Sequence, residues 1–249
     1  MNNLEFFTNR ASVRAFDPDR HVSEELLDKL LYAASHAPST GNMQLYTVIV
    51  TRDPERKAHL AHLHLDQPAA RNCDVMLTVC ADVHRFDLWC KARKAQSGLN
   101  NPGGRMSAIE DASIFAQQFI TAAEMNGLGC CYLGSAAYDM AGFTEALRLP
   151  KGVIPLFGIA VGWPSSVGTP SDRLPLDAIV SREVYHEPTL ADIDSYYAEK
   201  ENLEESAKYI AENNKETLAQ VYADVRYPRE RNERTGVELL KFLSASDDD

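Results

Sequence analysis

A short segment near the start of the chain places two arginines and a serine at alternate positions: Arg10, Ser12 and Arg14. The guanidinium group of arginine presents a planar set of N–H donors that fits the oxygens of a phosphate. A dianion needs at least two charge-assisted donors to offset the loss of its hydration, and this segment supplies them. The segment therefore predicts a phosphate-binding site.

A second polar segment farther along the chain contains Ser39, Asn42 and Gln44. The side-chain amides of Asn42 and Gln44 both donate and accept hydrogen bonds, as the edge of a flat heterocycle requires. Together with a phosphate receptor, this segment suggests a bound mononucleotide. The alternative for Asn42 and Gln44 is a polar turn between a helix and a strand.

The order of these residues resembles that of the FMN-dependent nitroreductase family. Members typically begin with Arg-x-Ser-x-Arg-x-Phe and continue with Pro-Ser-x-x-Asn-x-Gln, which read here as Arg10, Ser12, Arg14, Phe16 and Pro38, Ser39, Asn42, Gln44. Later blocks at residues 127–135, 149–164 and 173–175 resemble the branch of flavin reductases and oxygen-insensitive NADPH nitroreductases. The resemblance covers residues 4–186 well and the remainder loosely.

The resemblance implies which residues would contact FMN. The phosphate would lie near the first segment and Arg173, and the ring and ribityl chain near the amides and the backbone that follows a strand. The residues so implied are Arg10, Ala11, Ser12, Arg14, Ser39, Asn42, Gln44, Gln67, Tyr132, Gly134, Ser135 and Arg173. Two positions depart from the family pattern: Ala11 replaces a common basic residue, and Ser171 stands where a lysine is often found.

The same resemblance implies an activity, in which NADPH or NADH reduces the flavin at N5 and the flavin then reduces a nitroaromatic, a quinone or free flavin by a ping-pong mechanism. The cofactor supplies the chemistry, so no catalytic side chain is required. A preference for NADPH follows from the resemblance alone. Arginines at positions 226, 229, 231 and 234 would bind its 2′-phosphate, or they form a solvated basic stretch. The alternatives are a related flavoenzyme that performs dehalogenation or flavin fragmentation, and a flavin-binding protein without catalysis.

Charge and cysteine content restrict the partners and the compartment. The chain has 249 residues, a net charge of -11 and an isoelectric point of about 5.1, which argues against nucleic acid as a partner. No apolar run or signal pattern predicts membrane insertion or export, so the cytoplasm is expected. Five cysteines without a CxxC pair predict reduced thiols, and the adjacent Cys130 and Cys131 are interpreted as buried structural residues.

Other motifs give no support for a different chemistry. His59, His62 and His64 lack the spacing and partners of a metal site, and we interpret them as a solvated face of a helix. The sequence 127–129 is a lone Gly-x-Gly that follows a helix, so a dinucleotide-binding Rossmann motif is rejected. No Gly-x-Ser-x-Gly supports a serine hydrolase.

Periodicity predicts an α+β fold. Helices are expected at residues 23–35, 54–64 and 106–126, and strands at 45–51, 75–81, 130–133 and 153–161. Residues 86–105 are polar and end in turn-forming residues, which predicts a loop. The resemblance implies three layers, α/β/α, around a mostly antiparallel sheet, with the long helix 106–126 at a homodimer interface; a core helix of a monomer is the alternative.

Composition divides the chain into two parts. Residues 1–188 are expected to form the FMN-binding core, and residues 189–249 a C-terminal arm that packs on the partner subunit, because the arm has too few large aliphatic residues to build its own core. Within the arm, helices are expected at 190–213 and 237–243. The acidic end, residues 247–249, is expected to be disordered.

Overall fold

The computed structural model describes residues 3–166 and 168–244, and these residues form two compact units. The first unit consists of Met1–Thr169 together with Val237–Asp249, and the second of Pro170–Gly236. Residues 170–188 thus group with most of the expected arm, whereas the end of the last helix groups with the core. The predicted disorder of residues 247–249 lies outside the described residues.

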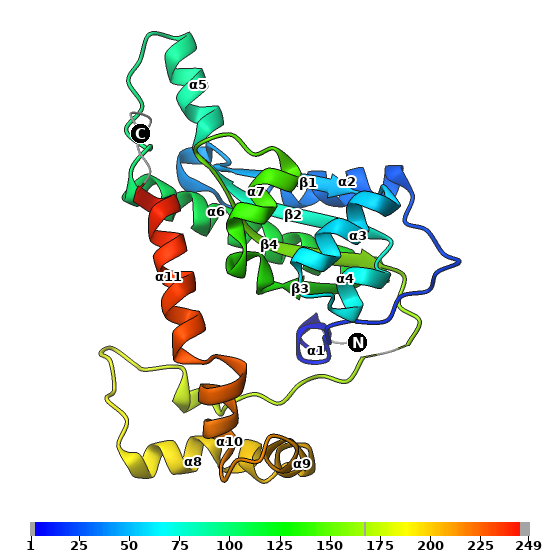
Figure 1. Ribbon diagram of the computed structural model, residues 1–249, viewed down its shortest axis with the longest axis vertical. Helices are drawn as coiled ribbons and strands as arrows, with labels where there is room; N and C mark the ends of the chain where they lie inside the picture. Colours follow the sequence, from blue (N-terminus) through cyan, green and yellow to red (C-terminus); the bar gives the residue numbers. More distant parts are fainter. Residues whose placement is uncertain (1–2, 167, 245–249) are drawn as a thin grey trace. The chain divides into compact units, whose positions relative to one another are not determined.

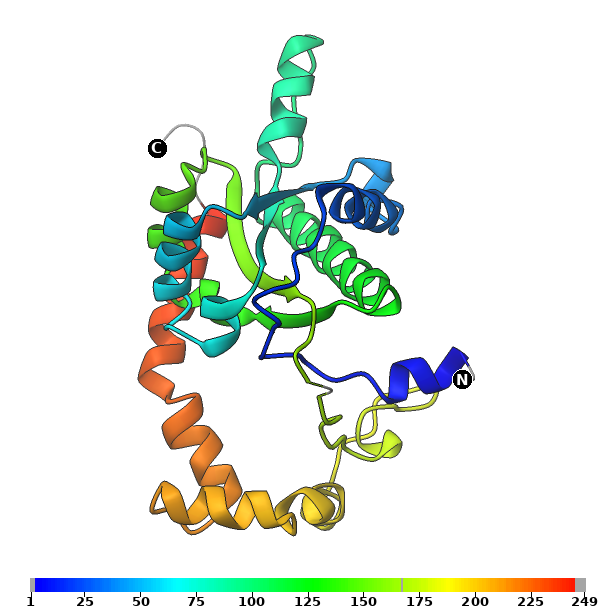
Figure 2. The same cartoon turned by 90° about the vertical axis from the view of Figure 1, so that its right-hand side faces the viewer.

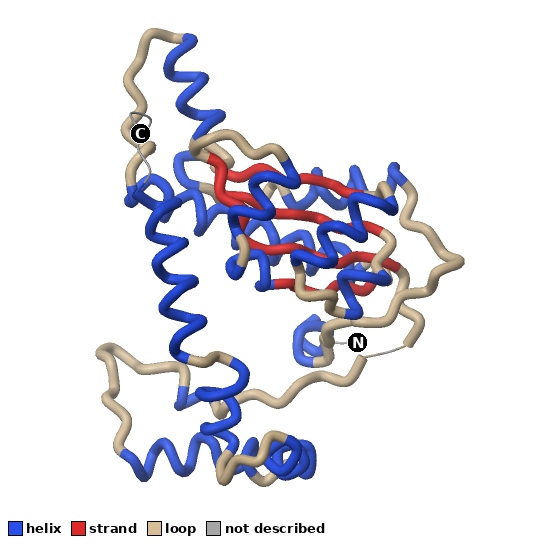
Figure 3. The backbone as a smooth tube through the Cα atoms, in the orientation of Figure 1, coloured by secondary structure: helices blue, strands red, loops and turns tan. Residues whose placement is uncertain are grey.

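The first unit is built around a four-stranded antiparallel sheet in the order β1-β2-β4-β3 (Figures 1 and 3). The strands are β1 (Tyr46–Thr51), β2 (Val75–Asp82), β3 (Gly129–Leu133) and β4 (Val153–Gly162). All eight residues of β2 are buried, as expected for a central strand with both faces covered. The four strands predicted from the sequence are confirmed.

Helices cover both faces of this sheet (Figure 2). One face carries α2 (Glu24–Ala34) and the long α6 (Pro102–Met125), and the other carries α3 (Pro54–Leu63), α4 (Pro68–Asn72) and α7 (Met140–Leu147). Each face has its own hydrophobic cluster, which includes Phe119 in the first and Phe143 in the second; both side chains have 0% exposure. The predicted three-layer α+β fold is confirmed.

Local capping explains where the main helices begin and end. The hydroxyl of Ser23 accepts a hydrogen bond from the N–H of Leu26 at 3.2 Å, so α2 starts where the sequence predicted. The side chain of Asn101 accepts from the N–H groups of Gly103 and Gly104 at the start of α6. After α6, Gly127 adopts φ +81°, the left-handed conformation that commonly ends a helix.

The predicted loop at residues 86–105 was wrong in its first part. Residues His84–Ala92 form helix α5, which projects from the sheet in Figure 1; much of it is exposed, including the apolar side chains of Leu88 and Trp89. Helix α6 also begins four residues earlier than expected, at Pro102. A glycine is needed in its first turn, since a Cβ on Gly104 would lie 2.1 Å from the carbonyl oxygen of Leu99.

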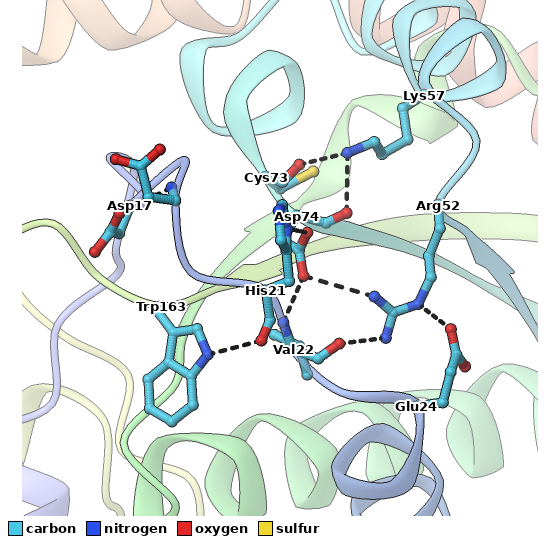
Figure 4. Close-up of polar contacts among 10 residues, drawn as sticks. Asp17, His21, Val22, Glu24, Arg52, Lys57, Cys73, Asp74 and Trp163 are labelled. Carbon is cyan, nitrogen blue, oxygen red and sulfur yellow. Dashed lines mark hydrogen bonds and ion pairs between the residues drawn. The ribbon is translucent and has the colours of Figure 1, made fainter.

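The chain between residues 17 and 24 is fastened to the sheet by Asp74 (Figure 4). The carboxylate of Asp74 accepts from Nδ1 of His21 at 2.8 Å and from the backbone N–H of Val22 at 2.7 Å, and lies 3.6 Å from the guanidinium of Arg52. On the other side of the segment, Nε1 of Trp163 donates to the carbonyl of His21. These contacts fix the segment that follows Arg10–Phe16.

The second unit is mainly helical. It contains η3 (Leu176–Ala178), α8 (Leu190–Glu201), α9 (Glu204–Glu212), α10 (Leu218–Gln220), η4 (Val221–Arg226) and the first part of α11 (Arg229–Ser244). The helix expected at 190–213 is therefore two helices, because the chain leaves helical geometry at Leu203. Within the described residues, no helix has the length and apolar character needed to cross a membrane.

Candidate functional site

The segment Arg10–Phe16 runs beside the edge strand β3. The N–H of Val13 donates to the carbonyl of Cys130 at 3.0 Å, and Phe16 pairs with Pro164 beyond the end of β4. The side chain of Val13 lies over Gly129, where a Cβ would come within 2.6 Å of it. A glycine at the start of β3 thus allows the close approach that places the predicted phosphate-binding residues along this edge.

The two arginines of this segment differ in their partners. Arg10 forms a bidentate ion pair with Glu124 of α6, with Nε at 3.1 Å and Nη2 at 2.8 Å from the two carboxylate oxygens. This hydrogen bond raises the pKa of Arg10 above its ordinary value. Arg14 is exposed, and no described residue forms an ion pair or hydrogen bond with it or with the hydroxyl of Ser12. Arg14 and Ser12 are therefore available to an anion.

Gln67 and Ser135 lie together on the same side of the sheet. Nε2 of Gln67 donates to the hydroxyl of Ser135 at 2.9 Å and to the carbonyl of His64 at 3.0 Å. The ring of His64 completes the cluster, with Nδ1 2.9 Å from the same hydroxyl. Two predicted site residues are thus brought together by a histidine that the sequence interpretation had placed elsewhere.

His64 is buried, and the prediction that it belongs to a solvated face was wrong. Its exposed fraction is 0%, its ring lies 4.7 Å from that of Phe143, and burial lowers its pKa to about 4. The helix α3 ends at Leu63, so His64 leaves the helix face that carries the exposed His59 and His62. Among the described residues, no group of three or more His, Cys, Asp or Glu side chains could hold a metal ion.

Tyr132 and Gly134 lie at the end of β3, next to Ser135. Tyr132 is half exposed and its ring packs against Phe157, with 4.5 Å between the ring centroids. Partial burial raises the pKa of Tyr132 to about 12, so its hydroxyl stays protonated at neutral pH. Gly134 is exposed, and among the described residues other than its two chain neighbours only Tyr132 lies within 4 Å of a Cβ built on it, so the backbone there is open to a ligand.

The second predicted segment forms a tightly turned loop before β1. Asn42 and Gln44 have positive φ angles of 55° and 47°, as does Gly41 at 55°. Nε2 of Gln44 donates to Oδ1 of Asn42 at 2.6 Å and to the hydroxyl of Ser39 at 3.3 Å. Left-handed backbone at non-glycine residues costs energy and persists where surrounding contacts hold it, as at many functional sites.

Asp111 of α6 supplies the contacts that hold this loop. One carboxylate oxygen accepts from the N–H of Thr40 at 2.8 Å and from its hydroxyl at 2.9 Å, and the other accepts from the N–H of Leu45 at 3.1 Å. The side chain is almost completely buried, at 2% exposure. Asp111 therefore sets the conformation of the loop that carries Asn42 and Gln44.

Within one chain, the two predicted segments lie at opposite ends of the sheet. The loop before β1 lies at the end of the sheet where β4 begins, because Tyr46 pairs with Ala81 and Ala81 pairs with Ile154. Val13 lies at the end where β4 finishes, because it bonds to Cys130, which pairs with Val161. From Ile154 to Val161 a strand rises about 23 Å at roughly 3.3 Å per residue. Ser39, Asn42 and Gln44 are therefore not brought together with Arg10, Ser12 and Arg14 of the same chain.

Arg173 lies in the second unit. Its Nη1 donates to the backbone carbonyls of Ser171 and Asp172, and Asp172 itself pairs with Lys200 at 2.7 Å.

The guanidinium of Arg226 lies over the ring of Tyr209 at 5.1 Å, and Arg229 pairs with Glu233 at 2.6 Å. The roles predicted for Arg173 and for the basic residues of the arm stay predictions.

The described cysteines are free and buried, in agreement with their interpretation as reduced structural thiols. Burial raises the pKa of Cys130 and Cys131, although the nearby charges of Arg10 and, for Cys131, Arg14 lower it in part. A thiol with a raised pKa is a poor nucleophile at neutral pH. We therefore assign no redox role to the adjacent pair.

Comparisons with known proteins agree with this architecture. A family model described as "Nitroreductase family" matches residues 7–163. A Bacillus subtilis (strain 168) protein named FMN reductase (NADPH) is 35% identical over 190 residues, which are 76% of this chain and 74% of that protein. Among solved structures, a Bacteroides fragilis protein is 41% identical with a TM-score of 0.93, and covers 96% of this chain and 97% of its own. A nitroreductase from B. subtilis is 28% identical with a TM-score of 0.83, and the match covers 97% of this chain and 98% of that one.

Proposed function

The chain belongs to the nitroreductase family, and on this premise we propose that it is an FMN-dependent oxidoreductase that uses NAD(P)H to reduce small electron acceptors. The acceptors would be nitroaromatics, quinones or free flavin. One observation carries the proposal: Arg14 and Ser12, which have no hydrogen-bond or ion-pair partner among the described residues, lie beside β3. The same strand ends at Gly134, whose backbone is open to a ligand. A relative named FMN reductase (NADPH) supports both the cofactor and the electron donor.

The residues present fit the groups of FMN. Arg14 and the hydroxyl of Ser12 are unpaired donors for a phosphate, and the pair with Glu124 leaves Nη1 of Arg10 free to donate as well. Gly134 leaves room for the approach of a flat ring to the backbone, and the hydroxyl of Ser135 and the amide of Gln67 supply polar groups beside it. FMN, when bound, supplies the hydride chemistry, and these residues bind and orient it.

We further propose that the active protein is a homodimer in which each site uses both chains. The amides of Asn42 and Gln44 lie at the far end of the sheet from Arg10 and Arg14 of the same chain, so a second copy would supply them. Helix α6 offers a surface for this contact, because Met106, Ile114 and Met125 are exposed on it. Exposed apolar residues grouped on one element favour an interface.

The proposed site needs no nucleophile or general base from the chain. The oxidised coenzyme would leave before the acceptor binds in the same place, which predicts parallel lines in double-reciprocal plots. A cytoplasmic location suits the free buried cysteines of the described residues.

The spectrum of the purified protein with added FMN tests the proposal. We expect a yellow complex that NADPH bleaches under anaerobic conditions and that nitrofurazone or a quinone restores. A complex that NADPH does not bleach would instead indicate a flavin carrier. A bleached complex that neither acceptor reoxidises would indicate a related flavoenzyme with another reaction. Protein that takes up no FMN would contradict all three.

A further inference from the structure

A buried histidine without a role in the proposed site contacts a residue that belongs to it. Nδ1 of His64 lies 2.9 Å from the hydroxyl of Ser135, and Nε2 of His64 is buried without a hydrogen-bond partner. This Nε2 faces β4, since a Cβ on Gly158 would lie 2.5 Å from it. The environment of the two ring nitrogens therefore decides which of them carries the proton.

The orientation of the Gln67 amide is fixed by the chain itself. The carbonyl of His64 can only accept a hydrogen bond, so the group 3.0 Å from it must be the NH2 of Gln67. The same NH2 lies 2.9 Å from the hydroxyl oxygen of Ser135 and donates to it. One lone pair of this oxygen is thus occupied by Gln67.

The two tautomers of His64 leave different groups unpaired. With the proton on Nε2, a buried N–H would face Gly158 without an acceptor. With the proton on Nδ1, the ring donates to Ser135 and only the lone pair of Nε2 lacks a partner. Buried unpaired N–H groups are rarer than buried unpaired acceptors, so the Nδ1–H tautomer is favoured.

We propose that His64 is a positioning residue that makes the hydroxyl of Ser135 a hydrogen-bond donor toward the bound flavin. When Gln67 and His64 both donate to the oxygen of Ser135, its lone pairs are occupied and its own proton is left to donate elsewhere. No other described residue receives that proton. This inference rests on the proposed function, which places the flavin beside Gly134 and Ser135.

A donor at this position has a definite effect on a flavin. The reduced ring carries more negative charge than the oxidised ring, so a hydroxyl donor stabilises the reduced form and raises the reduction potential. The burial of His64 keeps the ring neutral, because its pKa is lowered to about 4. The ring therefore holds the same tautomer across the neutral pH range.

The tautomer is tested first, on the protein without flavin. Two-bond 1H–15N spectra of histidine-labelled protein distinguish Nδ1–H from Nε2–H, and we expect Nδ1–H for His64. An Nε2–H ring would overturn the proposal, because Ser135 would then donate to the histidine. This measurement does not depend on flavin binding, so it stands even if the proposed function fails.

Two substitutions then test the effect on the flavin. His64→Leu removes the donor, and His64→Asn keeps an N–H near the position of Nδ1. For His64→Leu we expect the midpoint potential of bound FMN to fall by about 30 mV relative to the unsubstituted protein. For a two-electron couple this is a shift of about tenfold toward the oxidised form. For His64→Asn we expect a potential close to that of the unsubstituted protein.

Ser135→Ala provides the matched control, since His64→Leu should have no further effect on the potential in that background. Equal potentials in all the variants would overturn the proposal, as would equal losses in His64→Leu and His64→Asn, which would indicate a packing role. Failure of the unsubstituted protein to bind FMN would instead contradict the proposed function. If His64→Leu does not fold, the tautomer and Ser135→Ala decide, since loss of the hydroxyl donor should lower the potential and an unchanged potential would overturn the proposal.

Discussion

Asp111 and Glu124 lie thirteen positions apart on α6, and each holds one of the two predicted segments: Asp111 the loop Thr40–Leu45, and Glu124 the side chain of Arg10. At 1.5 Å per residue the two positions are about 20 Å apart along the helix. A single rigid helix thus sets the distance between the amide-bearing loop and the phosphate-binding segment. In a symmetric dimer, the same helix would set the positions of both segments in both sites.

Replacing Asp111 with Ala should destabilise the protein and loosen the loop. The buried N–H of Leu45 would lose its acceptor at a cost of about 1–3 kcal/mol, and the half-buried N–H of Thr40 would lose its acceptor at a smaller cost. Urea denaturation measures the loss, and the affinity for FMN should fall with it. Glu110→Ala is the matched control, because Glu110 is exposed and should change stability by less than about 0.5 kcal/mol. Equal stability of the two variants would contradict this role.

Replacing Arg14 with Ala should weaken FMN binding. A charge-assisted contact with the phosphate is worth about 1.5–3 kcal/mol, so the dissociation constant should rise about 10- to 150-fold. Titration of the protein with FMN, followed by quenching of flavin fluorescence, measures the change. Arg93→Ala removes an equal charge from an exposed position and should leave the affinity within about twofold. Unchanged affinity in Arg14→Ala would remove Arg14 from the site.

Replacing Gly129 with Ala should disturb the same segment without a change of charge. The new methyl group would lie 2.6 Å from the Cβ of Val13, so the backbone beside β3 would have to move. Overpacking of this kind costs about 1–3 kcal/mol in stability, and displacement of Arg14 should weaken FMN binding as well. Thermal unfolding and flavin titration are the two measurements. Gly98→Ala serves as the control, since a Cβ there meets nothing within 4 Å.

The titration of His64 should make stability depend on pH. Its pKa is lowered from 6.5 to about 4 in the folded protein, so between these values the unfolded chain binds a proton that the folded chain does not. The free energy of unfolding therefore carries the full contribution of neutral, buried His64 above about pH 6.5, and it loses this contribution as the pH falls toward 4. The expected loss is on the order of 3 kcal/mol.

This dependence is measured as the loss in free energy of unfolding between pH 7.5 and pH 4.5, and the loss is compared between the unsubstituted protein and two variants. His64→Gln should show a smaller loss than the unsubstituted protein over this range. His59→Gln, at an exposed position on α3, should retain the full loss. An equal loss in all three proteins would show that His64 does not carry the effect.

Replacing Ile114 with Asp should separate the proposed dimer. Ile114 is 43% exposed on α6 in the single chain, and a buried unpaired carboxylate at an interface is strongly unfavourable. Sedimentation equilibrium should show monomers, and FMN binding should weaken because each site would lose the loop of the other chain. Ile114→Val keeps an apolar side chain and should remain dimeric. A dimeric Ile114→Asp protein would place the interface elsewhere.

Local patterns in the sequence predicted the elements that depend on neighbouring residues. The cap at Ser23, the four strands and the left-handed Gly127 all follow from short-range preferences. Helix α5 was missed because only Cys90 of its nine residues is buried and Leu88 and Trp89 are exposed, so its apolar residues do not mark one buried face.

Long-range contacts could not be predicted in the same way. Asp111 meets Thr40, and His64 meets Ser135, across 71 positions in each case. No signal in the sequence separates Asp111 from its exposed acidic neighbour Glu110. The sequence pattern selected Arg10, Asn42 and Gln44 as candidate site residues. Their separation within one chain could not be predicted from it, because that separation depends on the order and register of the strands.

The bidentate pair between Arg10 and Glu124 has a consequence for the life of the protein before it meets its cofactor. Arg10 has an internal counter-ion and does not need a phosphate to be neutralised, whereas Arg14 has no ion pair among the described residues and keeps its full charge for an anion. The folded chain therefore does not depend on flavin mononucleotide to offset the charge of Arg10, and the charge that draws the phosphate in is that of Arg14.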